Sequence, residues 1–176
     1  HNVENYMAAA LAVRGLCSAD DIVYVARNFS GVRHRIEFVR EKDGVKFYND
    51  SIGSSPTRTI ATLRSFDTKV ILIAGGYDKH LPFDRLAGEI LEHVKALFLT
   101  GDTAQAIKSA VESAKGYDAR GLPITVTDDF DGAVRAAAGA AVGGDCVLLS
   151  PACASFDKFK NFEVRGDRFV SVVRAL

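Results

Sequence analysis

The chain has 176 residues, of which 48% are hydrophobic, so it is long enough to bury a sizeable core. Its 22 Lys and Arg residues balance its 22 Asp and Glu residues, so no whole-molecule field attracts nucleic acid or an acidic membrane. No apolar run approaches the length of a membrane span, and the three cysteines (Cys17, Cys146 and Cys153) show no zinc-ligand spacing. We expect a globular cytoplasmic protein with reduced thiols.

The first 30 residues predict a pair of helices. Apolar residues fall at helical spacing from Val3 to Val13, Gly15 marks a break, and Ser18 is a candidate N-cap for the second helix. The chain opens on His1, already inside the first predicted helix and without an initiator methionine. This suggests a fragment trimmed at its amino end.

A β-hairpin is predicted next, followed by an alternating α/β pattern. Apolar residues alternate between Arg35 and Asn49 around an Asp43-Gly44 turn signal. Strands are then expected at 70–74, 96–100, 124–126 and 146–149, and helices at 84–93, 103–115, 130–141 and 164–176. Such alternation predicts a Rossmann-like, doubly wound, mainly parallel sheet flanked by helices. Ligands of such sheets bind beyond the carboxyl ends of the strands.

Two of the predicted strand ends carry segments suited to ligand binding. In "GGYDKHL" the paired glycines permit close backbone approach, and Lys79 offers a charge for a carboxylate or phosphate. A tight turn with a surface lysine explains this segment equally well. In "SPACASFDKFKNF" small residues would let a ligand approach the strand end, although phenylalanines at three-residue spacing are usually core residues. The chain contains neither a P-loop nor a dinucleotide-binding glycine motif.

Three further polar segments admit a functional and a structural interpretation. His34 lies between two arginines. An imidazole and a neighbouring guanidinium could together stack on a base and bind a phosphate, or the three residues could begin a solvated strand. Asp50 precedes a helix start at Pro56, where free N–H groups favour an anion, although Ser55 could be an ordinary N-cap. Asn2 and Asn5 share a helical face and could read an adenine-like ring, or could be ordinary surface amides.

In this order, these segments resemble the carboxy-terminal portion of the Mur ligases over nearly the whole chain. The resemblance is carried by "HNVEN", "GVRHR", "YNDSIGSSPTRT", "GGYDK" and "LLSPACASFDKFKNFEVRGDRF". It is greatest for the members that add D-glutamate to UDP-N-acetylmuramoyl-L-alanine in peptidoglycan synthesis. The resemblance implies that residues 1–30 continue from a central ATP-binding domain and that residues 31–176 form a Rossmann-like amino-acid-binding domain.

The resemblance also implies roles for individual residues on a nucleotide side. Asn2 and Asn5 match the asparagines that meet the adenine of ATP, and His34 and Arg35 match a pair that contacts the base and phosphate. Asp50 matches the aspartate that holds the ribose hydroxyls.

A second group of matched residues falls on the amino-acid side. Lys79, Ser155, Phe156 and Phe162 match positions that bind D-glutamate, and Ser54 matches a threonine that often faces the same amino acid. The sequence departs from the common N-D-S-K-A-T pattern, because Ile52 replaces a lysine whose contact is either lost or replaced, for example by Arg58.

The family reaction proceeds through an acyl phosphate and needs ATP and Mg²⁺, but the P-loop, the magnesium ligands and a carbamylated lysine belong to the preceding domain. The resemblance therefore implies no catalytic residue and no metal site in this chain, which would be an inactive, monomeric part of a larger enzyme. Its partners would be D-glutamate, UDP-N-acetylmuramoyl-L-alanine and the missing N-terminal and central domains. Alternatives are a related Mur or folylpolyglutamate-type ligase with another amino acid, and a stand-alone binding module.

Overall fold

The computed structural model describes residues 2–29 and 31–176, with side chains from residue 4 onward, and its contacts divide the chain into two compact units, residues 1–32 and 33–176. The first unit contains α1 (Asn2–Ala12) and α2 (Ala19–Asn28). Ser18 caps α2 as predicted: its Oγ accepts from the Asp21 amide at 3.2 Å, and Asp21 Oδ2 accepts from the Ser18 amide at 2.9 Å. The two helices are also joined by an edge-on contact between Tyr6 and Phe29.

The second unit contains a six-stranded sheet in the order β1-β2-β6-β3-β4-β5. β1 (Glu37–Lys42) and β2 (Val45–Asn49) form the predicted antiparallel hairpin, whose Asp43-Gly44 turn adopts positive φ at both residues. The other strands run parallel to β2: β3 (Val70–Ala74), β4 (Val94–Leu99), β5 (Ile124–Val126) and β6 (Cys146–Leu149). The expected mainly parallel α/β fold is therefore confirmed.

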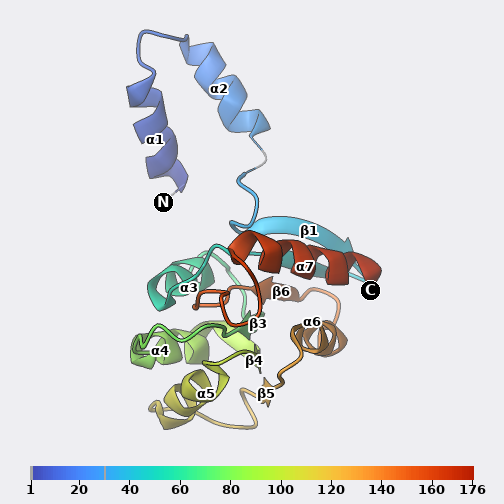
Figure 1. The fold of residues 1–176 in the computed structure, drawn as a ribbon. Helices are drawn as coiled ribbons and strands as arrows, with labels where there is room; N and C mark the ends of the chain where they lie inside the picture. The colour runs from blue at the N-terminus through green and yellow to red at the C-terminus, as the bar shows by residue number, and fades with distance from the viewer. Residues whose placement is uncertain (1, 30) are drawn as a thin grey trace. The chain divides into compact units, whose positions relative to one another are not determined.

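Helices cover both faces of this sheet (Figure 1). On one face lie α3 (Pro56–Leu63), α4 (Asp84–His93) and α5 (Ala104–Ser113), and on the other lie α6 (Phe130–Gly139) and α7 (Phe162–Ala175). Successive strand residues point to opposite faces, so Leu72 packs into the core under α3–α5 whereas Ile71 and Ile73 pack with Phe169 of α7. No helix in residues 2–29 and 31–176 is long and apolar enough to cross a membrane.

Some details differ from the sequence predictions. β4 begins at Val94, directly after α4, and α7 begins at Phe162, because Asn161 caps it by accepting from the Val164 amide at 2.9 Å. Ser55 occupies the N-cap position before Pro56, but its side chain makes no capping hydrogen bond. The amide that such a cap would satisfy, that of Arg58, donates instead to the Ser55 carbonyl at 3.1 Å.

The strand order places the carboxyl ends of β2, β6 and β3 side by side. The chain passes from β2 through α3 to β3, and after β4 and β5 it returns so that β6 lies between β2 and β3. The loops after these three strands therefore meet at one edge of the sheet. The order of the strands reverses at this place, and open α/β sheets bind their ligands at such a point.

Candidate functional site

The loop after β6 joins the other two loops by backbone hydrogen bonds. The Ala152 amide donates to the Gly53 carbonyl at 2.9 Å, and the Tyr77 amide donates to the Ala154 carbonyl at 2.9 Å. Gly76 has φ +149, and a Cβ there would overlap the Ala154 carbonyl oxygen. Only glycine fits this approach, so the small residues after β6 serve close backbone packing between the loops.

Asp50 lies at the buried end of this edge, with 2% of its surface exposed. Its Oδ2 accepts from Ser150 Oγ at 2.7 Å and from Thr62 Oγ1 at 2.8 Å, and its Oδ1 accepts from the Ile36 amide at 3.3 Å. Burial raises the pKa of Asp50, while these hydrogen bonds and the charge of Arg35 oppose the rise. The carboxylate therefore fixes the post-β2 loop against α3 and β6.

His34 is buried beside Asp50's neighbour, Asn49. The Asn49 side-chain NH₂ faces two groups that can only accept, Glu37 Oε2 at 3.0 Å and the Gly166 carbonyl at 3.5 Å, and it lies 3.0 Å from His34 Nδ1. Because an amide NH₂ only donates, Nδ1 is the acceptor of this contact in the neutral tautomer that has its proton on Nε2. Gly166 leaves room for the ring, because a Cβ there would overlap Nδ1.

Arg165 of α7 links the two halves of the edge, a role that the sequence analysis missed. It is 2% exposed; its Nε and Nη2 donate to Ser51 Oγ and O at 3.0 and 2.9 Å, and its Nη1 donates to the Cys153 and Ala154 carbonyls at 3.1 and 3.0 Å. Burial lowers the pKa of Arg165 to about 10. The available signal was its helical spacing to Phe169 and Val172, which places it on the buried face of α7.

The predicted amino-acid-side residues lie around the post-β3 and post-β6 loops. Lys79 is exposed, Ser155 is buried, and Phe156 is 61% exposed with its ring edge-on to Tyr77 at 6.0 Å. Phe162 instead packs edge-on against His34, also at 6.0 Å. The two phenylalanines, both predicted to bind D-glutamate, therefore have different aromatic partners.

The remaining predicted residues occupy simpler positions. Arg35 is exposed, Ser54 is half-buried, and Asn5 is exposed on α1 in the first unit, whereas the predicted role of Asn2 falls on a side chain outside the described part of the structure. Beside Ile52, which replaces the family lysine, Arg58 Nη1 donates to the Ile52 carbonyl at 3.4 Å. A guanidinium therefore lies next to the position whose cation is missing.

Cys153 lies within the post-β6 loop and is 4% exposed. Its Sγ lies 3.1 Å from Thr103 Oγ1, which in turn bonds both polar groups of the Gly76 backbone at 3.1 Å. Burial raises the pKa of the Cys153 thiol to about 11, so this side chain is a packing element and not a nucleophile.

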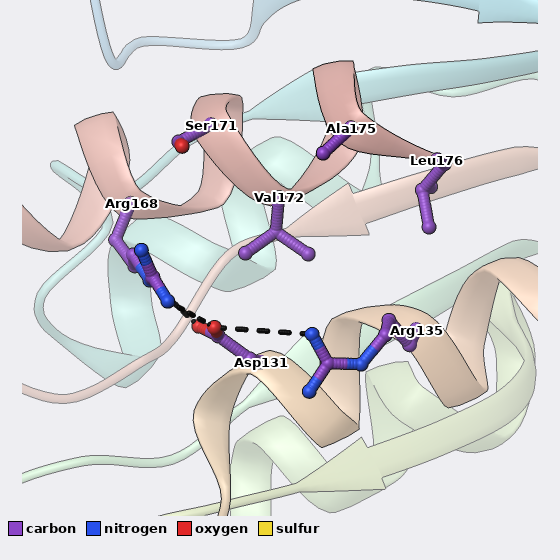
Figure 2. Close-up of a pocket in the computed structure, with 7 residues that line it drawn as sticks. All are labelled: Asp131, Arg135, Arg168, Ser171, Val172, Ala175 and Leu176. Carbon is purple, nitrogen blue, oxygen red and sulfur yellow. Dashed lines mark hydrogen bonds and ion pairs between the residues drawn. The ribbon is translucent and has the colours of Figure 1, made fainter.

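Two cavities on the α7 side of the sheet lie apart from these residues. Figure 2 shows the first, of about 200 Å³, in which Asp131 of α6 pairs with both Arg168 and Arg135. The second, of about 550 Å³, is lined by Arg33 and Asp167, which form an ion pair at 2.6 Å, and by further α7 residues. Neither includes a predicted site residue.

One cluster of possible metal ligands occurs in the described ranges, at Glu89, Glu92 and His93 near the end of α4. It lies at the opposite edge of the sheet from the three loops, since β4 begins immediately after it. Arg64 already forms a two-point contact with Glu89, through Nε at 2.9 Å and through Nη2. The cluster is therefore an ion-paired surface group of this helix.

The fold is shared with solved structures of proteins named as ligases or synthases. A folylpolyglutamate synthase/dihydrofolate synthase from Yersinia pestis aligns with a TM-score of 0.63 at 15% identity, covering 95% of this chain and 36% of that one. A murein peptide ligase from Psychrobacter arcticus aligns with a TM-score of 0.58 at 15% identity, covering 100% and 37%. At such identities the likeness establishes the fold.

The sequence comparisons are more specific. Residues 34–153 match the family model described as "Mur ligase, glutamate ligase domain". The chain therefore belongs to the Mur ligase family. It is 54% identical over 176 residues to the UDP-N-acetylmuramoylalanine–D-glutamate ligase of Clostridium novyi and 52% identical over 173 residues to that of Clostridium perfringens. The two alignments include 100% and 98% of this chain, but the chain spans only 38% of the length of each relative.

Proposed function

We propose that this chain is the amino-acid-binding part of an ATP-dependent ligase that joins D-glutamate to UDP-N-acetylmuramoyl-L-alanine in the cytoplasm. The observation that carries the proposal is the 54% identity across the entire chain to a D-glutamate ligase. The edge formed by three loops, which contain Asp50, Lys79 and Ser155, supports it. The folylpolyglutamate-type alternative has weaker support, because those proteins share 15–16% identity and the fold.

The nucleotide side of the second unit comprises His34, Arg35 and Asp50. Asn2 and Asn5 of the first unit are proposed separately to meet the adenine of ATP in the complete enzyme. In the tautomer whose Nδ1 accepts from Asn49, His34 offers its Nε2–H as a donor, and Arg35 is an exposed cation suited to a phosphate. Of the three hydrogen bonds to the Asp50 carboxylate, the longest, 3.3 Å, joins Oδ1 to the Ile36 amide. Oδ1 is therefore the oxygen that a ribose hydroxyl would engage. The ring of Phe162 supports this side by packing on His34.

The amino-acid side comprises Lys79, Ser155 and Phe156, with Ser54 nearby along the post-β2 loop. Lys79 supplies an exposed ammonium for a carboxylate, and Phe156 supplies an apolar surface. The guanidinium of Arg58 takes the place of the family lysine next to Ile52. ATP and Mg²⁺, when bound in the complete enzyme, would supply phosphoryl activation of the substrate carboxylate, and these residues would orient the amine that attacks it.

The first unit is proposed to pack against the central ATP-binding domain that precedes it in a monomeric enzyme. Its support is the exposure of large apolar side chains on α1 and α2: Met7 is 60% exposed, Leu11 67% and Tyr24 68%. Such exposure is costly in water and is expected where another domain covers the surface.

The test uses a chimera in which this chain replaces the aligned residues of the Clostridium novyi ligase. We expect the chimera to release phosphate from ATP only when UDP-N-acetylmuramoyl-L-alanine and D-glutamate are both present, with L-glutamate inactive. The unaltered relative is the positive control, and the relative lacking the exchanged segment is the negative control. A folded chimera that forms no product, or that uses L-glutamate equally well, would contradict the proposal.

A further inference from the structure

Two aromatic side chains project together from the amino-acid side of the edge. Tyr77 follows β3 and is 41% exposed, and Phe156 follows β6 and is 61% exposed. Their rings meet edge-on, with centroids 6.0 Å apart and an interplanar angle of 73°. The contact between them covers only part of each ring and leaves an apolar surface open to solvent.

The backbone beneath this pair is held rigidly. β3 and β6 are adjacent parallel strands, and the Tyr77 amide donates to the Ala154 carbonyl at 2.9 Å in an isolated antiparallel bridge. Gly76 packs against the same carbonyl, and Arg165 Nη1 donates to it at 3.0 Å. The two rings therefore stand on a fixed base, and only their outer faces are free to meet a ligand.

Another exposed aromatic pair in the unit shows what an ordinary surface contact looks like. Phe38 on β1 is 54% exposed, but its partner Tyr48, at 5.6 Å, packs onto Phe66 and the core under α3–α5. One member of that pair is anchored in the core. Tyr77 has no such anchor among the core clusters of the described residues, and its aromatic partner is the still more exposed Phe156.

We propose that Tyr77 is a specificity-determining residue that forms, with Phe156, an aromatic clamp on the side-chain methylenes of the incoming amino acid. This inference rests on the proposed function and adds a residue to it. Lys79, two positions after Tyr77, holds a carboxylate while the clamp covers the apolar part of the same molecule and keeps water from the ionic contact. A side chain shorter by one methylene would leave part of the clamp uncovered.

The test compares Tyr77→Ala and Tyr77→Phe in the chimera. We expect Tyr77→Ala to raise the KM for D-glutamate about tenfold, as loss of one aromatic contact implies, and to leave the KM for ATP within about twofold. Tyr77→Phe keeps the ring and should stay within about twofold of the parent for both substrates. The preference for D-glutamate over D-aspartate, as a ratio of kcat/KM, should fall in Tyr77→Ala and persist in Tyr77→Phe.

Phe38→Ala is the matched control, because it removes an exposed aromatic ring of similar exposure from a different strand. It should leave the KM for D-glutamate within about twofold, and thermal unfolding of every variant shows whether it is folded. An active chimera in which Tyr77→Ala leaves the KM for D-glutamate unchanged, or raises the KM for ATP equally, overturns the inference alone. A chimera inactive with D-glutamate overturns the proposed function and the inference with it.

Discussion

The two ends of the ligand edge differ in how their polar groups are satisfied. On the Asp50 side, formed by His34, Asn49, Asp50 and Ser51, the side chains are buried and hydrogen-bonded within the protein. On the Tyr77 side, formed by Tyr77, Lys79 and Phe156, the side chains are exposed. The difference suggests that the Asp50 side is a preorganised scaffold that a ligand meets at its rim, whereas the Tyr77 side completes its contacts only with a ligand.

Loss of Arg165 should have the largest effect, because it joins the two sides. Arg165→Met leaves the carbonyls of Ser51 and Cys153 without their Arg165 donor in a buried site, and leaves the Ala154 carbonyl with the Tyr77 amide alone, which should lower the free energy of unfolding by about 3–5 kcal/mol. Urea denaturation measures this loss. Arg168→Met, three residues along the same helix, removes an exposed ion pair and should cost less than about 1 kcal/mol. Equal losses in the two variants would refute the linking role.

Gly166→Ala should disturb the Asp50 side alone. The added Cβ would overlap His34 Nδ1 and lie 3.1 Å from Asn49 Nδ2, an overpacking that costs about 1–3 kcal/mol against roughly 1 kcal/mol of improved helix propensity. Gly88→Ala on α4, where a Cβ meets nothing within 4 Å, is the control and should be neutral or stabilising. The comparison fails if Gly166→Ala is as stable as Gly88→Ala in urea.

Asp50 should give a pH dependence of known sign. Its pKa in the folded protein is raised above the ordinary value of 3.8, so above that pH the folded chain retains a proton that the unfolded chain releases. Stability due to this group therefore falls as pH rises through the window between the two values. Asp50→Asn removes the titration. Between pH 4 and 7 the free energy of unfolding of the parent should therefore fall relative to that of the variant as pH rises. A constant difference would show that Asp50 ionises normally in the fold.

Lys79→Ala should have the smallest effect on stability, because the side chain is exposed. We expect the free energy of unfolding to change by less than about 0.5 kcal/mol, as for surface substitutions in general. A larger loss in urea denaturation would mean that the Tyr77 side has its own internal network and that the contrast with the Asp50 side is wrong.

Periodicity predicted the elements of this fold well, because each strand and helix buries one repeating face. The sheet edge itself was harder to predict, since it depends on contacts between residues far apart in the sequence. Arg165 reads as one more charge in "EVRGDRF", and only the packing of α7 shows that its guanidinium reaches Ser51, 114 positions away. Phe156 and Phe162 look equivalent in sequence, yet Phe156 lies in the post-β6 loop beside Tyr77, whereas Phe162 begins α7 and packs on His34.

The division of the edge into two sides is tested most directly by kinetics of two exposed cations in the chimera, Arg35 and Lys79. Arg35→Ala should raise the KM for ATP by about tenfold or more and leave the KM for D-glutamate within about twofold, because its side carries the nucleotide. Lys79→Ala should do the reverse. If both substitutions raise the same KM, or each raises both equally, the two-sided site proposed here is wrong.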